Sequence, residues 1–186
     1  MGRLVTRAGA LPGLPAVFVS ARERGGRTPA GAGLLIHDQS LIDLVRISAQ
    51  RDVPLAVDLD TVEGLAPDEA AIAFLAERLG VAIIITRRPA LAALAPRFAC
   101  RSLLHVHCLD STGLERALAA HPGDPVGTAL SPGLMLAQLS AAERRRLPAP
   151  VVAYGLVRGP EERDAALAAG AAGVVVAGFE SSILTG

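Results

Sequence analysis

The sequence contains no lysine and no tryptophan, has one tyrosine and two cysteines, and its charges sum to zero. Because lysine is absent, enzyme mechanisms that form a Schiff base on a lysine amine are excluded. Zero net charge argues against a strong general positive field for nucleic acid, although it is compatible with a local basic patch. The spacing of Cys100 and Cys108 matches no metal motif, so we expect two buried, reduced thiols.

Long apolar runs are also absent. No run approaches the roughly 20 residues of a membrane-spanning helix, and the N-terminus lacks the apolar stretch of a secretory signal. These absences predict a cytoplasmic protein without membrane contact. The 186 residues, 51% of them hydrophobic, suffice for a domain with a real core. We expect one domain over residues 1–186, with residues 1–14 as an N-terminal extension.

The sequence repeats a unit made of a short apolar run and a helix-like segment. Eight runs have the continuous apolar character of parallel strands covered on both faces, and they lie at residues 16–19, 34–36, 55–57, 82–85, 103–106, 126–130, 151–153 and 174–176. Their mean spacing of roughly 23 residues suffices for a strand and a helix. The pattern predicts an α/β fold, a compact TIM-like (β/α)8 barrel, with an open flavodoxin-like sheet as the alternative. Residues 22–33 are too rich in glycine and proline for a helix, so we expect the first outer helix to be missing or replaced by a loop.

Helix boundaries are marked by capping residues, prolines and glycines. Pro67 is expected at a first helical position, with Asp68 in the positive first turn of that helix. The other expected boundary residues are Ser40, Gly80, Asp110 or Ser111, Pro160 and Gly170.

Functional groups of a barrel lie at the carboxyl ends of its strands, and the densest acidic cluster, Asp58, Asp60 and Glu63, follows the third apolar run. Asp58 and Asp60 alternate along a segment that we expect to be extended, so their carboxylates would point the same way. Such a pair could bind a divalent cation or share a proton. The alternative is that one caps the following loop while the other faces solvent.

Basic and imidazole side chains follow the next two runs. Thr86, Arg87 and Arg88 form a natural grip for a phosphate or carboxylate, or alternatively a surface arginine pair bound to neighbouring acids. His105 and His107 alternate along a strand, so both are expected to face the barrel interior, as hydrogen-bonded interior or rim histidines rather than metal ligands. We assign no catalytic residue, metal or cofactor.

Glycines follow the last two runs, where barrels commonly bind phosphate through backbone N–H groups. Gly155 and Gly178 are the candidates, and tight turns are the alternative reason for glycine there. Arg144, Arg145 and Arg146 end a predicted helix and complement its negative C-terminus. They are also weak candidates for RNA contacts, because few aromatic side chains are available for base stacking.

Several short motifs occur in order between about residues 54 and 180: DLDTVEGL at 58–65, PDE at 67–69, FL at 74–75, IITR at 84–87, LDS at 109–111, SPG at 131–133, GLV at 155–157 and AAGA at 168–171. Together they resemble the signature of the glycerol-3-phosphate-responsive antiterminators, H-I-D-L-I-x-G-L, D-E, F-L, I-S-T-[KR], L-D-S, L-P-G, G-G-L-I and A-G-A. The chain departs from that signature where Asp58 replaces His, His105 replaces Arg, Ala129 replaces an acid, Tyr154 replaces the first Gly of G-G-L-I, and residues 176–178 replace T-S-N.

The resemblance implies a barrel that senses glycerol 3-phosphate, or a similar phosphorylated small molecule, and is not an enzyme. It also implies that the barrel binds leader mRNA to prevent transcription termination in glycerol-uptake operons. The ligand contacts that it implies are Asp60, Arg87, Pro132, Gly133 and Gly155. Asp58 and Gly178 join them from the residue patterns above.

Two other functions stay open. One is a small-molecule or metal-dependent barrel enzyme that uses Asp58, Asp60 and the interior histidines, although no converging nucleophile and base are apparent in the sequence. The other is a degenerate barrel that acts only as an interaction module. The sequence also leaves open whether copies of the chain form a homo-oligomer.

Overall fold

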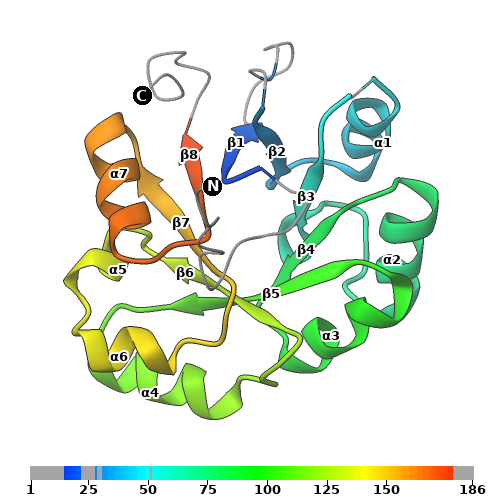
Figure 1. Cartoon of the computed structure of the whole chain (residues 1–186). Coiled ribbons are helices and arrows are strands. Elements are labelled where there is room, and N and C mark those ends of the chain that lie inside the picture. The colour runs from blue at the N-terminus through cyan, green and yellow to red at the C-terminus, as the bar shows by residue number, and fades with distance from the viewer. Residues whose placement is uncertain (1–14, 22–27, 29–30, 51, 178–186) are drawn as a thin grey trace, which may run out of the picture.

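The computed structural model describes residues 15–21, 28, 31–50 and 52–177, and its eight parallel strands close into a barrel (Figure 1). In sequence order the strands are β1 (Val17–Ala21), β2 (Gly33–Ile36), β3 (Leu55–Asp58), β4 (Ile83–Thr86), β5 (Arg101–His107), β6 (Gly127–Ser131), β7 (Val151–Val157) and β8 (Gly173–Ala177). β1 pairs with β8, with Val17 opposite Val174. The predicted barrel is therefore confirmed, and the open-sheet alternative is wrong.

Helices surround the barrel on its outside (Figure 1). They are α1 (Leu41–Gln50), α2 (Glu69–Ala73) continued by a π-helical turn (Phe74–Arg78), α3 (Pro89–Leu94) continued by a 3-10 turn (Ala95–Phe98), α4 (Ser111–Ala120), α5 (Met135–Gln138), α6 (Ala141–Arg146) and α7 (Pro160–Ala168). The loop expected in place of a first helix falls mainly on residues 22–27 and 29–30, which lie outside the described residues, as do residues 1–14 and Gly178. None of the helices in the described ranges is long and apolar enough to cross a membrane.

The capping residues act largely as predicted. Ser40 and Asp110 each accept a hydrogen bond from the backbone N–H three residues further on, which satisfies a donor that the helix itself leaves free. Pro160 opens α7. Gly80 and Gly170 follow helix ends with φ of +60° and +105°, a conformation that glycine adopts without steric cost.

The structure corrects the predicted position of Pro67. α2 begins at Glu69, and Asp68 is its N-cap, accepting a hydrogen bond from the Ala71 N–H at 2.8 Å. The proline therefore precedes the cap instead of occupying the first helical position. An aspartate carboxylate can accept the N–H two or three residues on, so it competes successfully for the cap.

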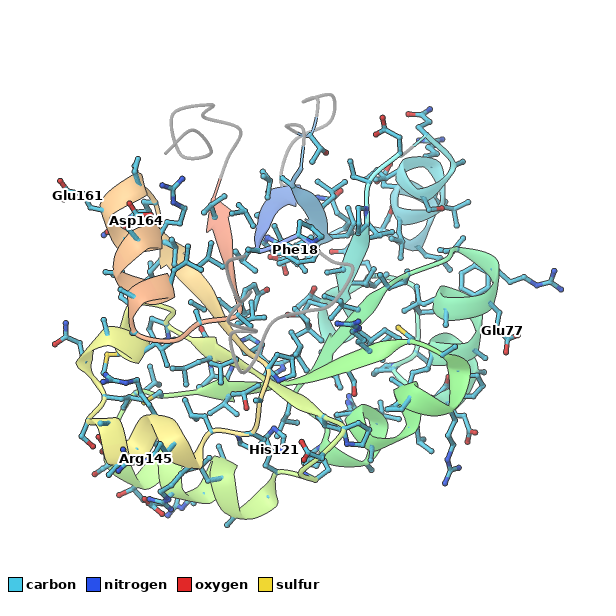
Figure 2. The ribbon with its side chains drawn as sticks, in the orientation of Figure 1. Phe18, Glu77, His121, Arg145, Glu161 and Asp164 are labelled. Carbon is cyan, nitrogen blue, oxygen red and sulfur yellow. The ribbon has the colours of Figure 1, made fainter. Side chains whose placement is uncertain are left out.

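The core has an inner and an outer part because alternate residues of each strand face opposite sides. The barrel interior is filled by Phe18, Leu35, Ala56, Ile83, Ile85, Leu103, Ala129, Val152 and Val175. Outward residues such as Leu104 and Val106 pack under the helices. Phe18 (labelled in Figure 2) is the large aromatic of the interior, and a Cβ on Gly33 would lie 2.4 Å from its ring, so position 33 must be small. Cys100 and Cys108 are buried and unpaired, as predicted.

Candidate ligand site at the mouth of the barrel

The barrel interior changes from apolar to polar at the carboxyl ends of the strands. Two positions after an inner apolar residue, seven strands or strand ends carry a polar side chain, and these are Ser20, His37, Asp58, Arg87, His105, Ser131 and Tyr154. Because side chains alternate along a strand, a step of two residues keeps the same inward face and moves one layer toward the mouth. The mouth is therefore lined by a polar layer that rests on an apolar floor.

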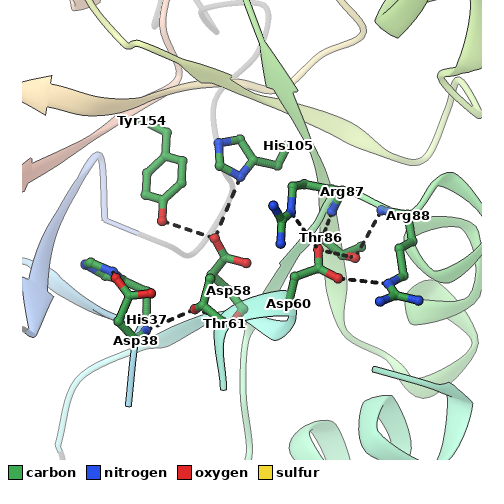
Figure 3. Close-up of polar contacts among 10 residues, drawn as sticks. All are labelled: His37, Asp38, Asp58, Asp60, Thr61, Thr86, Arg87, Arg88, His105 and Tyr154. Carbon is green, nitrogen blue, oxygen red and sulfur yellow. Dashed lines mark hydrogen bonds and ion pairs between the residues drawn. The ribbon is translucent and has the colours of Figure 1, made fainter. Parts of the chain in front are cut away.

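Asp58 lies at the centre of this layer (Figure 3). Its Oδ2 accepts a hydrogen bond from the Tyr154 hydroxyl at 3.2 Å and lies 3.7 Å from Nδ1 of His105. The rings of His105 and Tyr154 meet edge to face, with centroids 4.6 Å apart. Three strands, β3, β5 and β7, thus contribute to one compact cluster, which we call the Asp58 cluster (Asp58, His105 and Tyr154).

Burial sets the protonation of this cluster. It raises the pKa of Asp58 to about 6, against the Tyr154 hydrogen bond that lowers it and the nearby Asp60 charge that raises it further. Burial likewise lowers the pKa of His105 to about 3, and the neighbouring His107 lowers it as well. Near neutral pH the cluster therefore holds an ionised carboxylate beside a neutral imidazole.

Two polar atoms of the cluster lack partners. Among the described residues, neither Oδ1 of Asp58 nor Nε2 of His105 has a hydrogen-bond partner, although the two side chains are only 3% and 8% exposed. A buried polar atom without a partner costs about 1–3 kcal/mol, and more when it is charged. Buried polar atoms without partners are rare in folded proteins, and these two lie at the end of the barrel where ligands of such folds bind.

Asp60 is satisfied by the protein itself. Its Oδ2 accepts hydrogen bonds from the Thr86 hydroxyl at 2.9 Å and the Arg87 N–H at 2.5 Å, and its Oδ1 accepts one from Nε of Arg88 at 3.0 Å (Figure 3). Although burial opposes it, these hydrogen bonds lower the pKa of Asp60. Nε of Arg87 lies further away, 3.7 Å from Oδ2, and its side chain is 55% exposed.

The geometry corrects one prediction here. Asp58 and Asp60 do not point the same way, because Leu59–Thr61 form a 3-10 turn instead of continuing the strand. One carboxylate faces Tyr154 and the other faces the end of β4. The expected anion grip of Thr86, Arg87 and Arg88 contains an anion already, namely the Asp60 carboxylate.

A second hydrogen-bonded chain of the mouth was missed from the sequence. The Ser20 hydroxyl lies 2.5 Å from Nε2 of His37, and Nδ1 of His37 lies 2.7 Å from Oδ2 of Asp38. Asp38 has a φ of +51°, and its N–H donates to the Thr61 hydroxyl at 3.0 Å. The inward alternation of Ser20 with Phe18 is the signal that could have placed this serine at the mouth.

His105 and His107 occupy different levels of β5. His105 faces the interior, as predicted, whereas His107 is exposed at the rim, with its ring centroid 4.2 Å from that of His105. Within residues 15–21, 28, 31–50 and 52–177, no group of three or more His, Cys, Asp or Glu side chains is arranged to hold a metal ion.

The predicted glycines join the ends of β6 and β7. The Gly133 N–H donates to the Gly155 carbonyl at 2.8 Å, and a Cβ on Gly133 would lie 3.0 Å from backbone atoms of the facing segment. Gly155 has a φ of +76°. These glycines allow a close approach of the two strands beside Tyr154, and Pro132 precedes the contact. Gly178 lies outside the described residues.

The three arginines of α6 lie away from the mouth, close to the start of β7. Arg144 donates to the carbonyl groups of Leu136 and Leu139. Arg146 forms a forked ion pair with Glu115 of α4 at 2.5 and 2.7 Å. Arg145, labelled in Figure 2, is exposed.

Comparison with known proteins agrees with this architecture. The family model described as glycerol-3-phosphate responsive antiterminator matches residues 33–178. No curated protein matches the sequence.

Solved structures share the barrel at low sequence identity. The glycerol uptake operon antiterminator regulatory protein of Listeria monocytogenes has a TM-score of 0.76 and 20% identity, over 92% of this chain and 97% of that one. The antiterminator-related protein of Thermotoga maritima has a TM-score of 0.69 and 23% identity, over 92% and 98%. Deoxyribose phosphate aldolase of Aeropyrum pernix has a TM-score of 0.59 and 17% identity, over 92% of this chain and 86% of that one.

Proposed function

Because the chain belongs to the glycerol-3-phosphate responsive antiterminator family, we propose that it is a regulator that binds glycerol 3-phosphate or a similar phosphorylated polyol. In this proposal the loaded or empty barrel acts on the leader mRNA of glycerol-uptake genes, which places its action in the cytoplasm. The observation that supports ligand binding is the pair of buried, unpartnered atoms of the Asp58 cluster. A regulator needs such a site, whereas it needs no nucleophile.

Arg87 is the residue that we propose for the phosphate group. Its guanidinium is more than half exposed and only loosely paired with Asp60 at 3.7 Å, so it can turn toward an anion at the mouth. Its charge reaches the Asp58 cluster, because it lowers the pKa of both Asp58 and His105. A guanidinium fork matches two phosphate oxygens. Backbone N–H groups near Gly155 and Gly178 would complete the phosphate contacts.

Calorimetric titration with glycerol 3-phosphate tests this function. We expect saturable binding by the wild type and a loss of at least tenfold in affinity for Arg87→Ala. Arg78→Ala is the matched control, because Arg78 is an exposed arginine on the outer wall and its removal changes the net charge equally. Absence of binding by the wild type would overturn the ligand proposal. An equal loss in both variants would reduce the role of Arg87 to general electrostatics.

Arg145 is the proposed RNA contact of the α6 arginines, since Arg144 and Arg146 are bound to carbonyl and carboxylate oxygens. Binding of leader RNA should weaken as salt rises, and Arg145→Ala should reduce the slope of log affinity against log salt by about one. Arg116→Ala, at an exposed position of α4, is the control. A wild type that binds no leader RNA at low salt would favour the interaction module instead.

The enzyme alternative is favoured by one observation, the chain of Ser20, His37 and Asp38. If Nδ1–H of His37 donates to Asp38, Nε2 can accept the serine proton, which is the order that an activated serine requires. A fluorophosphonate reagent tests it, because it reacts covalently with activated serines. We expect no labelling of the wild type beyond that of Ser20→Ala. Labelling that depends on both Ser20 and His37 would favour an enzyme.

A further inference from the structure

The Asp58 cluster offers hydrogen-bond acceptors and no donor to a molecule in the mouth. Nδ1 of His105 faces the carboxylate of Asp58 at 3.7 Å, so the ionised carboxylate favours the tautomer that carries its proton on Nδ1. Nε2 then has a lone pair. The Tyr154 hydroxyl donates its proton to Oδ2 of Asp58. Both unpartnered atoms, Oδ1 of Asp58 and Nε2 of His105, are thus acceptors that await donors.

A phosphate group cannot fill this position. A dianionic phosphate supplies no proton and would meet the like charge of Asp58, with Asp60 close by. Hydroxyl groups fit, because each one donates a proton and is uncharged. The cluster rests on the apolar interior formed by Ala56, Leu103 and Val152, which offers no side-chain donor from below.

We infer that the Asp58 cluster binds the hydroxyl end of the ligand. Oδ1 of Asp58 and Nε2 of His105 accept hydrogen bonds from ligand hydroxyl groups, while the phosphate points to the rim. This inference rests on the proposed function, and it adds the orientation of the ligand and the group that determines specificity. Asp58 and His105 are then specificity-determining residues, and ligands that have a phosphate without hydroxyl groups are rejected.

The test consists of four calorimetric titrations at pH 7.5. Wild type and Asp58→Asn are each titrated with glycerol 3-phosphate and with n-propyl phosphate, which has the same three carbons and phosphate but no hydroxyl. For the wild type we expect glycerol 3-phosphate to bind at least tenfold more tightly than propyl phosphate. Asp58→Asn should weaken glycerol 3-phosphate at least tenfold and propyl phosphate less than twofold. Asp52→Asn is the charge control, because Asp52 is exposed and precedes the other end of β3.

A pH series distinguishes the protonation of Asp58 from the protonation of the ligand phosphate. Asp58 faces Tyr154 of β7 and His105 of β5, with Asp60 and Arg87 acting on it through charge and His107 acting on His105. Protonation of Asp58 removes an acceptor, so the preference for glycerol 3-phosphate over propyl phosphate should shrink below pH 6. Both ligands are phosphate monoesters and titrate alike near pH 6, so that titration cancels in the ratio of their affinities.

The outcomes distinguish the inference from the function beneath it. If the wild type binds both phosphates equally and Asp58→Asn weakens neither selectively, the inference is wrong while the proposed ligand function stands. If the wild type binds neither, both are wrong. A preference for glycerol 3-phosphate that Asp58→Asn abolishes supports the inference, and a second variant, His105→Phe, should then reduce the same preference.

Discussion

Asp58 and Asp60 lie two residues apart at the end of one strand, and each side chain is only 3% exposed, yet they have opposite environments. Both oxygens of Asp60 accept hydrogen bonds from the end of β4, and its pKa is lowered. Asp58 has one unpartnered oxygen and a pKa raised to about 6. Equal side-chain exposure therefore accompanies different roles: Asp60 holds two strand ends together, whereas Asp58 is buried at a cost that a ligand can offset.

The largest effect should come from removing the satisfied carboxylate. Asp60→Ala leaves the buried Thr86 hydroxyl and the Arg87 N–H without their acceptor, so we expect the free energy of unfolding to fall by about 2–4 kcal/mol. Urea unfolding measures it. Asp52→Ala, at an exposed position, should stay within about 0.5 kcal/mol of the wild type. A loss below about 1 kcal/mol for Asp60→Ala would remove the contrast between the two carboxylates.

Asp58→Asn, in contrast, should raise the free energy of unfolding. Burial raises the pKa of Asp58 from 3.8 to about 6, and each pKa unit corresponds to about 1.4 kcal/mol between the two protonation states. The amide keeps a hydrogen bond to Tyr154 and removes the buried charge. We expect the ligand-free variant to be more stable than the wild type by about 1–3 kcal/mol at pH 8. Destabilisation by this variant would mean that Asp58 serves the fold.

The pH dependence of that gain sharpens the comparison. A carboxyl whose pKa is raised on folding is protonated more readily in the native state, so its destabilising effect is absent below about pH 4 and complete above about pH 6. His105, with a pKa lowered to about 3, acts in the opposite direction as pH falls below 6.5. Because His105 is present in both proteins, we compare the stability difference between Asp58→Asn and wild type, which should grow from pH 4 to 7. A flat difference would contradict the buried-charge explanation.

The smallest effect is expected from the exposed part of the Asp60 network. Arg88 is 58% exposed, and an ion pair of that exposure contributes less than about 1 kcal/mol. Arg88→Ala should therefore change the unfolding midpoint only slightly, and high salt should reduce even that change. A loss comparable to that of Asp60→Ala would mean that the guanidinium, and not the Thr86 hydroxyl and the Arg87 N–H, satisfies Asp60.

The fold could be predicted from the sequence because its signals are local. Eight apolar runs marked the strands, and caps such as Ser40 and Asp110 marked helix starts, since each depends on a few neighbouring residues. The membership of the family was also visible in short motifs, and it is confirmed. Which carboxylate is satisfied was not visible, because one 3-10 turn, Leu59–Thr61, redirects Asp60 away from Asp58.

The site depends on contacts between distant strands. Tyr154 reaches Asp58 across 96 positions of sequence, and Ser20 reaches His37 between neighbouring strands. Closure of the barrel creates both contacts, so no periodicity within one segment indicates them. Three of the departures from the family signature, Asp58, His105 and Tyr154, prove to be one cluster in contact. The three departures therefore change one part of the candidate site together.

The most direct test of whether Asp58 serves ligand binding at the expense of stability is thermal unfolding. Wild type and Asp58→Asn are each unfolded with and without glycerol 3-phosphate at pH 7.5. A ligand at one hundred times its dissociation constant stabilises a protein by about 2.7 kcal/mol. We predict that Asp58→Asn melts higher than the wild type without ligand and gains at most about half as much from the ligand, whereas the wild type gains several degrees. An Asp58→Asn variant that melts lower and gains as much as the wild type would contradict the account.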